Sequence, residues 1–221
     1  MKAALFLSAS PMGHAARGHA IAEEALENVR GRHSGLKVIA RDLAKADFGK
    51  IMADYAEAIL SRADHAVPAL TASEILIREL EETDALVIAT PMHNYTVPVA
   101  LKLWIDLVLR AGRSFGFRDQ LKVGLLADRP TLILVSSGGF VRGATASQPD
   151  HLTGYLTDVL ATVGILDLRF VYLEALARPD AAEQAVAQGR QEIAVDEQFG
   201  SGLAAGVALR DRVALPVVCR T

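Results

Sequence analysis

A polar and aromatic loop follows the most aliphatic stretch of the chain. Residues 85–89 form an unbroken apolar run, and Pro91 comes shortly after it. The residues after this proline are Met92, His93, Asn94 and Tyr95. An amide can hydrogen-bond the polar edge of a flat ligand, and an aromatic ring can pack on its face. The loop therefore suits a flat aromatic ligand; an ordinary turn before a helix at Pro98 would explain the prolines but not the polar residues.

A second loop, residues 8–18, is small and hydroxyl-bearing and leads into a predicted helix. It has neither the G-x-G-x-x-G of a dinucleotide loop nor the Gly-Lys-Ser/Thr of a P-loop. The free N–H groups and the dipole of a helix N-terminus nevertheless suit a phosphate monoester. Ser10 can add a hydroxyl and Arg17 a positive charge, although an ordinary strand-to-helix turn fits the same residues.

A third loop reads Ser136, Ser137, Gly138, Gly139 and Phe140. Two adjacent glycines let the backbone approach a ligand closely. Their N–H groups can hydrogen-bond an acceptor-rich ring edge and stabilise negative charge on it. A flexible turn is the alternative for this loop taken alone.

Strand-like and helix-like segments alternate along the chain, which is typical of an α/β parallel sheet. The predicted strands are residues 3–7, 36–40, 85–89, 131–135 and 166–173. The predicted helices are residues 18–30, 73–82, 97–111, 151–163 and 181–195. This pattern favours a flavodoxin-like three-layer sandwich, a five-stranded parallel sheet in the order 2-1-3-4-5 with helices on both faces. The three loops then meet at the carboxyl edge of the sheet, where such folds bind ligands.

Two long connections and a tail interrupt this repeat. Residues 42–71 include a predicted short helix at 55–60, and residues 112–129 separate the third helix from the fourth strand. Insertions of this length are commonly lids or interface elements, so we expect Phe115 and Phe117 to cover a substrate pocket. We expect residues 1–195 to form the domain and residues 196–221 a tail, either disordered or in contact with a partner.

Composition excludes several classes of protein. The 221 residues carry a net charge of −3, which gives no support for nucleic-acid or anionic-membrane binding. The lone cysteine, Cys219, excludes an intramolecular disulfide and a cysteine-based zinc site. The six histidines show no H-x-x-x-H spacing, so the sequence predicts no metal site. No apolar stretch approaches the roughly 20 residues that span a bilayer, and we expect a soluble, cytoplasmic protein.

Together the three loops describe a flavin mononucleotide (FMN) site, and longer stretches carry a family resemblance. These stretches are residues 41–43, 91–95, 101–115, 136–139 and 164–174. Through them the chain resembles the FMN-dependent NADH-azoreductase family, which belongs to the flavodoxin-like NAD(P)H:quinone oxidoreductases. The resemblance extends from Met1 to about Val195.

The resemblance implies a set of cofactor-binding residues. Those for the FMN phosphate are Ser10, Ala16, Arg17 and Gly18. Those for the isoalloxazine ring and its other edge are Met92, His93, Asn94, Tyr95, Ser136, Ser137, Gly138, Gly139 and Phe140. The family usually has serines where Ala16 and Gly18 stand, so we expect weaker FMN binding. Val141 and Arg142 stand where relatives often carry a histidine, which leaves no obligatory catalytic residue.

The resemblance also implies a ping-pong reaction. NAD(P)H gives a hydride to FMN, and a quinone or azo compound then takes two electrons. Family members are homodimers with the active site at the subunit interface. A flavodoxin-type electron carrier and a non-catalytic flavin-binding or sensing protein remain the alternatives. The sequence distinguishes neither NADH from NADPH nor one acceptor from another.

Overall fold

A five-stranded parallel sheet forms the centre of the protein, as seen in a computed structural model that describes residues 1–49 and 51–201. Its strands are β1 (Ala3–Ser8), β2 (Lys37–Asp42), β3 (Ala85–Pro91), β6 (Thr131–Ser136) and β7 (Leu168–Leu173). They lie in the order β2-β1-β3-β6-β7, and every neighbouring pair is parallel. This order confirms the predicted flavodoxin-like sheet.

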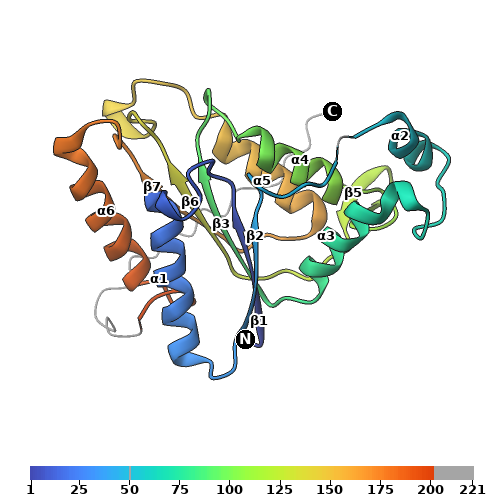
Figure 1. Ribbon diagram of the computed structural model, residues 1–221, viewed down its shortest axis with the longest axis horizontal. Helices are drawn as coiled ribbons and strands as arrows, with labels where there is room; N and C mark the ends of the chain where they lie inside the picture. Colours follow the sequence, from blue (N-terminus) through green and yellow to red (C-terminus); the bar gives the residue numbers. More distant parts are fainter. Residues whose placement is uncertain (50, 202–221) are drawn as a thin grey trace.

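Helices cover both faces of the sheet, which completes the three layers (Figure 1). One face carries α1 (Arg17–Arg32) and α6 (Pro179–Ala194). The other carries α3 (Thr71–Glu81), α4 (Val99–Val108) and α5 (Leu152–Val163).

The alternation of side chains along β1 shows why both faces need cover. Ala4 and Phe6 pack with the helices α1 and α6, whereas Leu5 and Leu7 pack with α3, α4 and α5. Successive side chains of a strand point to opposite faces, so a strand buried on both sides must be apolar throughout. All six residues of β1 are buried.

The two long connections have different structures. The first contains α2 (Ala53–Leu60), which confirms the predicted short helix, and a 3₁₀ turn, η2 (Pro68–Leu70). The second forms an antiparallel hairpin of β4 (Phe115–Arg118) and β5 (Leu121–Gly124), which the sequence analysis did not predict. Gly124 packs so closely on the end of α5 that a Cβ would lie 2.2 Å from the nitrogen of Gly164.

The helix predicted at 97–111 is shorter than expected. It begins at Val99, after the extended residue Pro98, and ends at Val108. The Ser114 hydroxyl donates to the carbonyl oxygen of Val108 and accepts from the N–H of Arg110 at 2.9 Å. These bonds replace the next helical turn with a loop.

Part of the segment assigned to the tail packs on the domain. Phe199 is fully buried in the core cluster that contains α1 and α6, and Asn28 and Arg32 of α1 bond backbone carbonyls of residues 197–199. The apolar end of the tail, residues 213–218, lies outside the described residues. Within the described ranges, no helix combines the length and apolar character needed to cross a membrane.

Candidate functional site

A cavity of about 340 Å³ opens at the carboxyl edge of the sheet. Its wall is formed by the loops after β1 and β7, by the first turn of α1 and by the last residues of β3 and β6, whereas the predicted residues 92–95 and 137–140 are not among its lining residues. The lining residues are Ser10, Ala15, Ala16, Arg17, Gly18, His19, Ala89, Thr90, Pro91, Ser136 and Leu176. The structure therefore brings together Ser10, Ala16, Arg17, Gly18 and Ser136 of the predicted set.

The N-terminus of α1 forms one wall of this cavity. Ala16 is the N-cap residue, and no described side chain makes a capping hydrogen bond there. The N–H groups of a helix's first turn have no partner within the helix, and the helix dipole adds positive potential at the same point. This terminus can therefore bind an anion through its backbone.

Gly18 lies close to Ser136 at this wall. A Cβ on Gly18 would lie 2.7 Å from the hydroxyl oxygen of Ser136, closer than such atoms approach in proteins. The absence of a side chain lets the Ser136 hydroxyl approach the first turn of α1. The structure thus supplies a hydroxyl from β6 beside the position where family members usually carry a serine.

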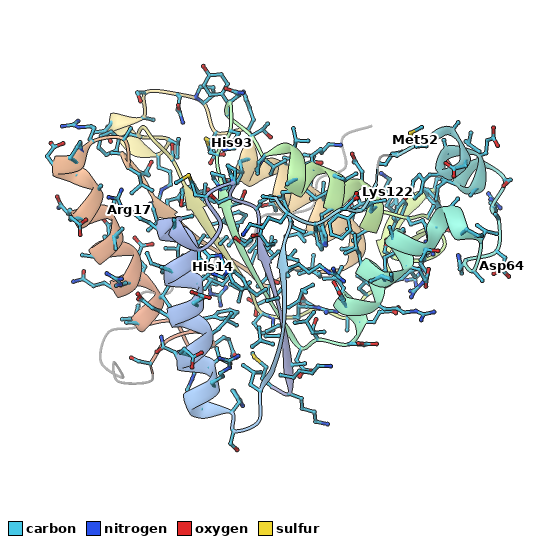
Figure 2. All side chains as sticks on the ribbon, viewed as in Figure 1. His14, Arg17, Met52, Asp64, His93 and Lys122 are labelled. Carbon is cyan, nitrogen blue, oxygen red and sulfur yellow. The ribbon has the colours of Figure 1, made fainter. Side chains whose placement is uncertain are left out.

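Arg17 adds a positive charge at the rim. One guanidinium nitrogen lies 3.5 Å from the carbonyl oxygen of Leu176, and another lies 3.9 Å from Glu183. Its side chain is 45% exposed, so it is free to turn toward a ligand. Figure 2 shows Arg17 at the start of α1, on the side that faces α6.

The loop after β3 is a tight turn at the same edge. His93 and Thr96 exchange backbone hydrogen bonds of 2.9 and 3.1 Å. Asn94 and Tyr95 between them have φ angles of 48° and 75°. The left-handed region disfavours side chains, above all bulky ones, and such residues cluster at ligand sites. The turn presents the Tyr95 ring at 48% exposure.

In the loop after β6, backbone carbonyl oxygens are hydrogen-bonded, whereas several backbone N–H groups are not. The carbonyl oxygens of Gly138 and Gly139 accept hydrogen bonds from Ala177 and Ala175. No acceptor in the described part of the chain pairs with the N–H groups of Gly138, Gly139 and Phe140. These N–H groups remain available to a ligand.

Gln148 connects the loop after β3 with the loop after β6. Since the family resemblance assigns both loops to the isoalloxazine ring, we call them the ring-side loops. Its side-chain amide donates to the hydroxyl of Ser137 at 3.1 Å and lies 3.5 Å from the sulfur of Met92. The backbone N–H of Met92 donates to the carbonyl oxygen of Ser136 at 2.8 Å. Sequence reasoning missed Gln148 because no local pattern places it near either loop.

Glu174 supports the segment that follows the double glycine. One oxygen of its carboxylate accepts from the N–H groups of Val141 and Arg142, at 2.6 and 2.9 Å. Arg142 also lies over the Tyr172 ring, 4.1 Å from its centroid. Glu174 follows β7 directly, so the rule that ligands bind at the carboxyl edge would have pointed to it.

Tyr172, whose ring packs against Arg142, is buried. Burial raises the pKa of Tyr172 to about 12, so it stays protonated near neutral pH. It bonds Asp150 at 3.2 Å. Burial opposes the ionisation of Asp150, but hydrogen bonds from the side chain and backbone of Thr153 hold the pKa of this carboxyl below its usual range.

The predicted lid residues lie in the hairpin. Phe115 is 8% exposed and Phe117 is 64% exposed, and their rings meet edge to face. Neither is among the described residues that line the cavity. Their assignment to a substrate pocket stays a prediction.

A cluster of two histidines and a glutamate lies at the start of α1, although the sequence predicted no metal site, and that prediction stays a prediction. His14, His19 and Glu23 each place one ligand atom within 4.8 Å of the others. The sequence pattern missed it because His14 lies in a 3₁₀ turn, η1 (Gly13–Ala15), and not in the same helix as the other two. Helical spacing places His19 and Glu23 on one face of α1 but gives no signal for His14.

Known proteins resemble the chain over most of its length. A family model described as a flavodoxin-like fold matches residues 2–195. FMN-dependent NADH:quinone oxidoreductase 5 of Burkholderia lata is 52% identical over 82% of this chain and 89% of its own. FMN-dependent NADH:quinone oxidoreductase 4 of Pseudomonas fluorescens is 48% identical over 82% of this chain and 88% of its own.

Solved structures agree with these relatives in fold. An azoreductase from Bacillus anthracis superposes with a TM-score of 0.74 at 24% identity, covering 87% of this chain and 96% of its own. An FMN-dependent NADH-azoreductase of the same species, in complex with FMN, superposes with a TM-score of 0.71 at 19% identity, covering 87% and 97%. The sequence matches and the shared topology confirm the predicted resemblance: the chain belongs to the family of FMN-dependent NADH:quinone oxidoreductases, within the flavodoxin-like fold.

Proposed function

We propose that the protein is an FMN-dependent NAD(P)H:quinone oxidoreductase that also reduces azo compounds. The observation that carries the proposal is a cavity at the carboxyl edge of the sheet, walled by the N-terminus of α1 and by the ends of β3 and β6, after which the two ring-side loops begin. The relatives from Burkholderia and Pseudomonas are named FMN-dependent NADH:quinone oxidoreductases. When bound, FMN supplies the redox chemistry, accepting a hydride from NADH or NADPH and passing two electrons to a quinone or azo acceptor.

The phosphate end of the site fits FMN. Ser10, which is 8% exposed, lines the cavity and has its hydroxyl 3.2 Å from the N–H of Met12. The first-turn N–H groups of α1 at Arg17 and Gly18, with the Ser136 hydroxyl beside them, would hold the phosphate oxygens. Ala16 contributes backbone only. The cradle that a Cβ on Gly18 would fill supports a close approach of backbone to ligand.

The ring end of the site would use backbone and side chains from two loops. Met92, His93, Asn94 and Tyr95 would line one side of the ring. Backbone N–H groups of Gly138, Gly139 and Phe140 would stabilise negative charge at its polar edge, with Ser137 held by Gln148. We assign no obligatory proton donor, and solvent would supply the protons.

The family resemblance supports a proposal for the assembly, and the sequence supports one for the location. We infer a homodimer in which the exposed Phe117 and Tyr95 face a partner subunit or its substrate, and a cytoplasmic enzyme. Such a dimer would place Phe115 and Phe117 of the hairpin at the substrate pocket. The mass of the protein in solution tests the homodimer, and a structure with FMN tests the position of the hairpin.

A non-catalytic flavin-binding protein is the second candidate. The observation that favours it is the pair Ala16 and Gly18, which remove two phosphate-binding hydroxyls relative to the usual family pattern. A carrier or sensor would bind FMN but would not exchange hydride with NAD(P)H.

An anaerobic titration separates these candidates. The purified protein, supplied with FMN, is mixed with NADH or NADPH while the flavin absorbance is recorded, and a quinone is then added. We expect bleaching by the nicotinamide and recovery on addition of the quinone. Bound flavin that does not bleach with either donor would leave the carrier or sensor, and failure to bind FMN would remove the enzyme proposal altogether.

A further inference from the structure

A second constellation lies at the start of α1, outside the residues assigned to FMN. It consists of His14 in η1 and of His19 and Glu23 on α1. Figure 2 places His14 and Arg17 on different sides of the beginning of this helix. His19 also lines the cavity beside Arg17, whereas His14 and Glu23 are not among its lining residues.

His19 is the fixed member of the histidine cluster. Its side chain is 5% exposed, and its Nδ1 atom lies 2.8 Å from the hydroxyl oxygen of Ser8. Its Nε2 atom is buried and makes no hydrogen bond to any atom of the described residues. A buried polar atom without a partner is costly, and each such atom in a folded protein calls for an explanation.

The unpartnered Nε2 atom points into the cluster. It lies 3.3 Å from Oε1 of Glu23, and Nδ1 of His14 lies 3.8 Å from the same oxygen. Metal bonds of about 2.0–2.1 Å in a tetrahedral site set ligand atoms about 3.4 Å apart. The observed separations thus need only small side-chain movements, and the exposed side chains of His14 (77%) and Glu23 (53%) can make them.

The contact with Ser8 also fits a metal ligand. An imidazole that donates its Nδ1–H to the Ser8 hydroxyl carries its lone pair on Nε2, the atom that faces Glu23. A hydrogen bond from the second ring nitrogen is the usual way in which proteins orient a ligating histidine. Nε2 of His19 lies at ion-pair distance from Oε1 of Glu23, 3.3 Å, but makes no hydrogen bond to it.

We propose that His14, His19 and Glu23 bind a divalent transition metal, Zn²⁺ in particular, with solvent water in the remaining position. Two imidazoles and a carboxylate suit zinc, whereas magnesium and calcium prefer oxygen ligands. The ion joins η1 to α1 and removes the unpartnered atom of His19. The site stands on these contacts and does not depend on the proposed oxidoreductase activity.

Calorimetric titration of ZnCl₂ into the untagged protein tests the site. We expect one ion to bind per chain. Glu23→Gln and His14→Ala change exposed side chains and should weaken binding by more than tenfold, as should His19→Ala. His151→Ala, an exposed histidine outside the cluster, is the matched control and should bind zinc as the parent protein does.

A further variant distinguishes a built site from adventitious binding by surface histidines. Ser8→Ala keeps all three ligands but removes the orienting contact, and it should weaken zinc binding by about 10- to 100-fold. Thermal melts with and without zinc confirm that each variant folds. If His19→Ala does not fold, His14→Ala and Glu23→Gln, which change exposed side chains, test the site. Absence of binding to the parent protein, or equal affinity in the parent and Glu23→Gln, would overturn the proposal.

Discussion

The two ends of the candidate FMN site are built in different ways. The phosphate end would use backbone N–H groups of α1 and the space left by Gly18 against Ser136. The ring end would use backbone N–H groups of the loop after β6 and, in addition, exposed side chains on a turn whose residues Asn94 and Tyr95 have left-handed backbone angles. Backbone recognition tolerates changes of side chain, whereas a strained turn depends on which residue occupies it. We therefore expect substitutions at the phosphate end to alter FMN affinity, and those at the ring end to alter loop stability and electron transfer.

The largest effect should come from filling the phosphate end. Gly18→Val places a branched side chain where even a Cβ would lie 2.7 Å from the Ser136 hydroxyl. The FMN phosphate would then lose its hydrogen bonds from two backbone N–H groups. At about 1.5 kcal/mol for each bond to a charged group, this loss predicts about a 100-fold increase in the Kd for FMN. Fluorescence titration of FMN measures it.

The matched control for this change is Gly31→Val. Gly31 belongs to the same helix, and a Cβ there would meet nothing within 4 Å. It makes the same exchange of glycine for a residue of higher helix propensity, without the collision. Equal FMN affinity in the two variants would contradict the assignment of the phosphate end.

Removing the support of the ring-side loop should have the next largest effect. Glu174→Ala leaves the N–H groups of Val141 and Arg142 without their acceptor, which predicts a loss of about 2 kcal/mol in the free energy of unfolding. The rate of flavin reduction by NADH should fall, while FMN affinity should change little. Denaturant unfolding and stopped-flow absorbance measure the two quantities.

Glu174→Gln provides the comparison for that prediction. Its side-chain oxygen can still accept from both N–H groups, so most of the stability should return. A large increase in the Kd for FMN in either variant would show that the two ends are not separable.

The charge of Arg17 should contribute less than the backbone beside it. Arg17→Ala removes a side chain that is 45% exposed at the rim, and we expect FMN affinity to fall about tenfold, or about 1.4 kcal/mol. High salt should reduce the difference from the parent protein, because salt screens exposed charges. Arg190→Ala, which removes an exposed arginine paired with Glu24 on α1, should leave FMN affinity unchanged.

The residues themselves explain how much of this arrangement the sequence could predict. The strand order and the meeting of the loops followed from apolar runs such as residues 85–89, because parallel strands end at a common edge. The hairpin was missed because Asp119 and Gln120 adopt positive φ angles without the Asn-Gly or Asp-Gly signal of such turns. Gln148 and Glu174 act across the fold, so no local spacing reveals their contacts. The histidine cluster likewise depends on the path of η1 between β1 and α1.

The smallest predicted effect tests the strained turn directly. Tyr95 has a φ of 75°, a conformation that costs a side-chain-bearing residue about 1–2 kcal/mol and glycine almost nothing. Tyr95→Gly also gains freedom in the unfolded chain, which offsets part of this relief, so we expect a net stabilisation of about 0.5–1 kcal/mol. For a domain of this size that corresponds to a rise of about 1–4 °C in Tm. Quinone reduction should nevertheless slow, since the ring proposed to pack near the flavin is lost, and Tyr95→Phe should retain both the strain and most of the activity. A Tyr95→Gly variant that is less stable than the parent protein would mean that ring contacts outweigh the backbone strain, and the contrast between a backbone-built and a side-chain-built end would then lose its physical basis.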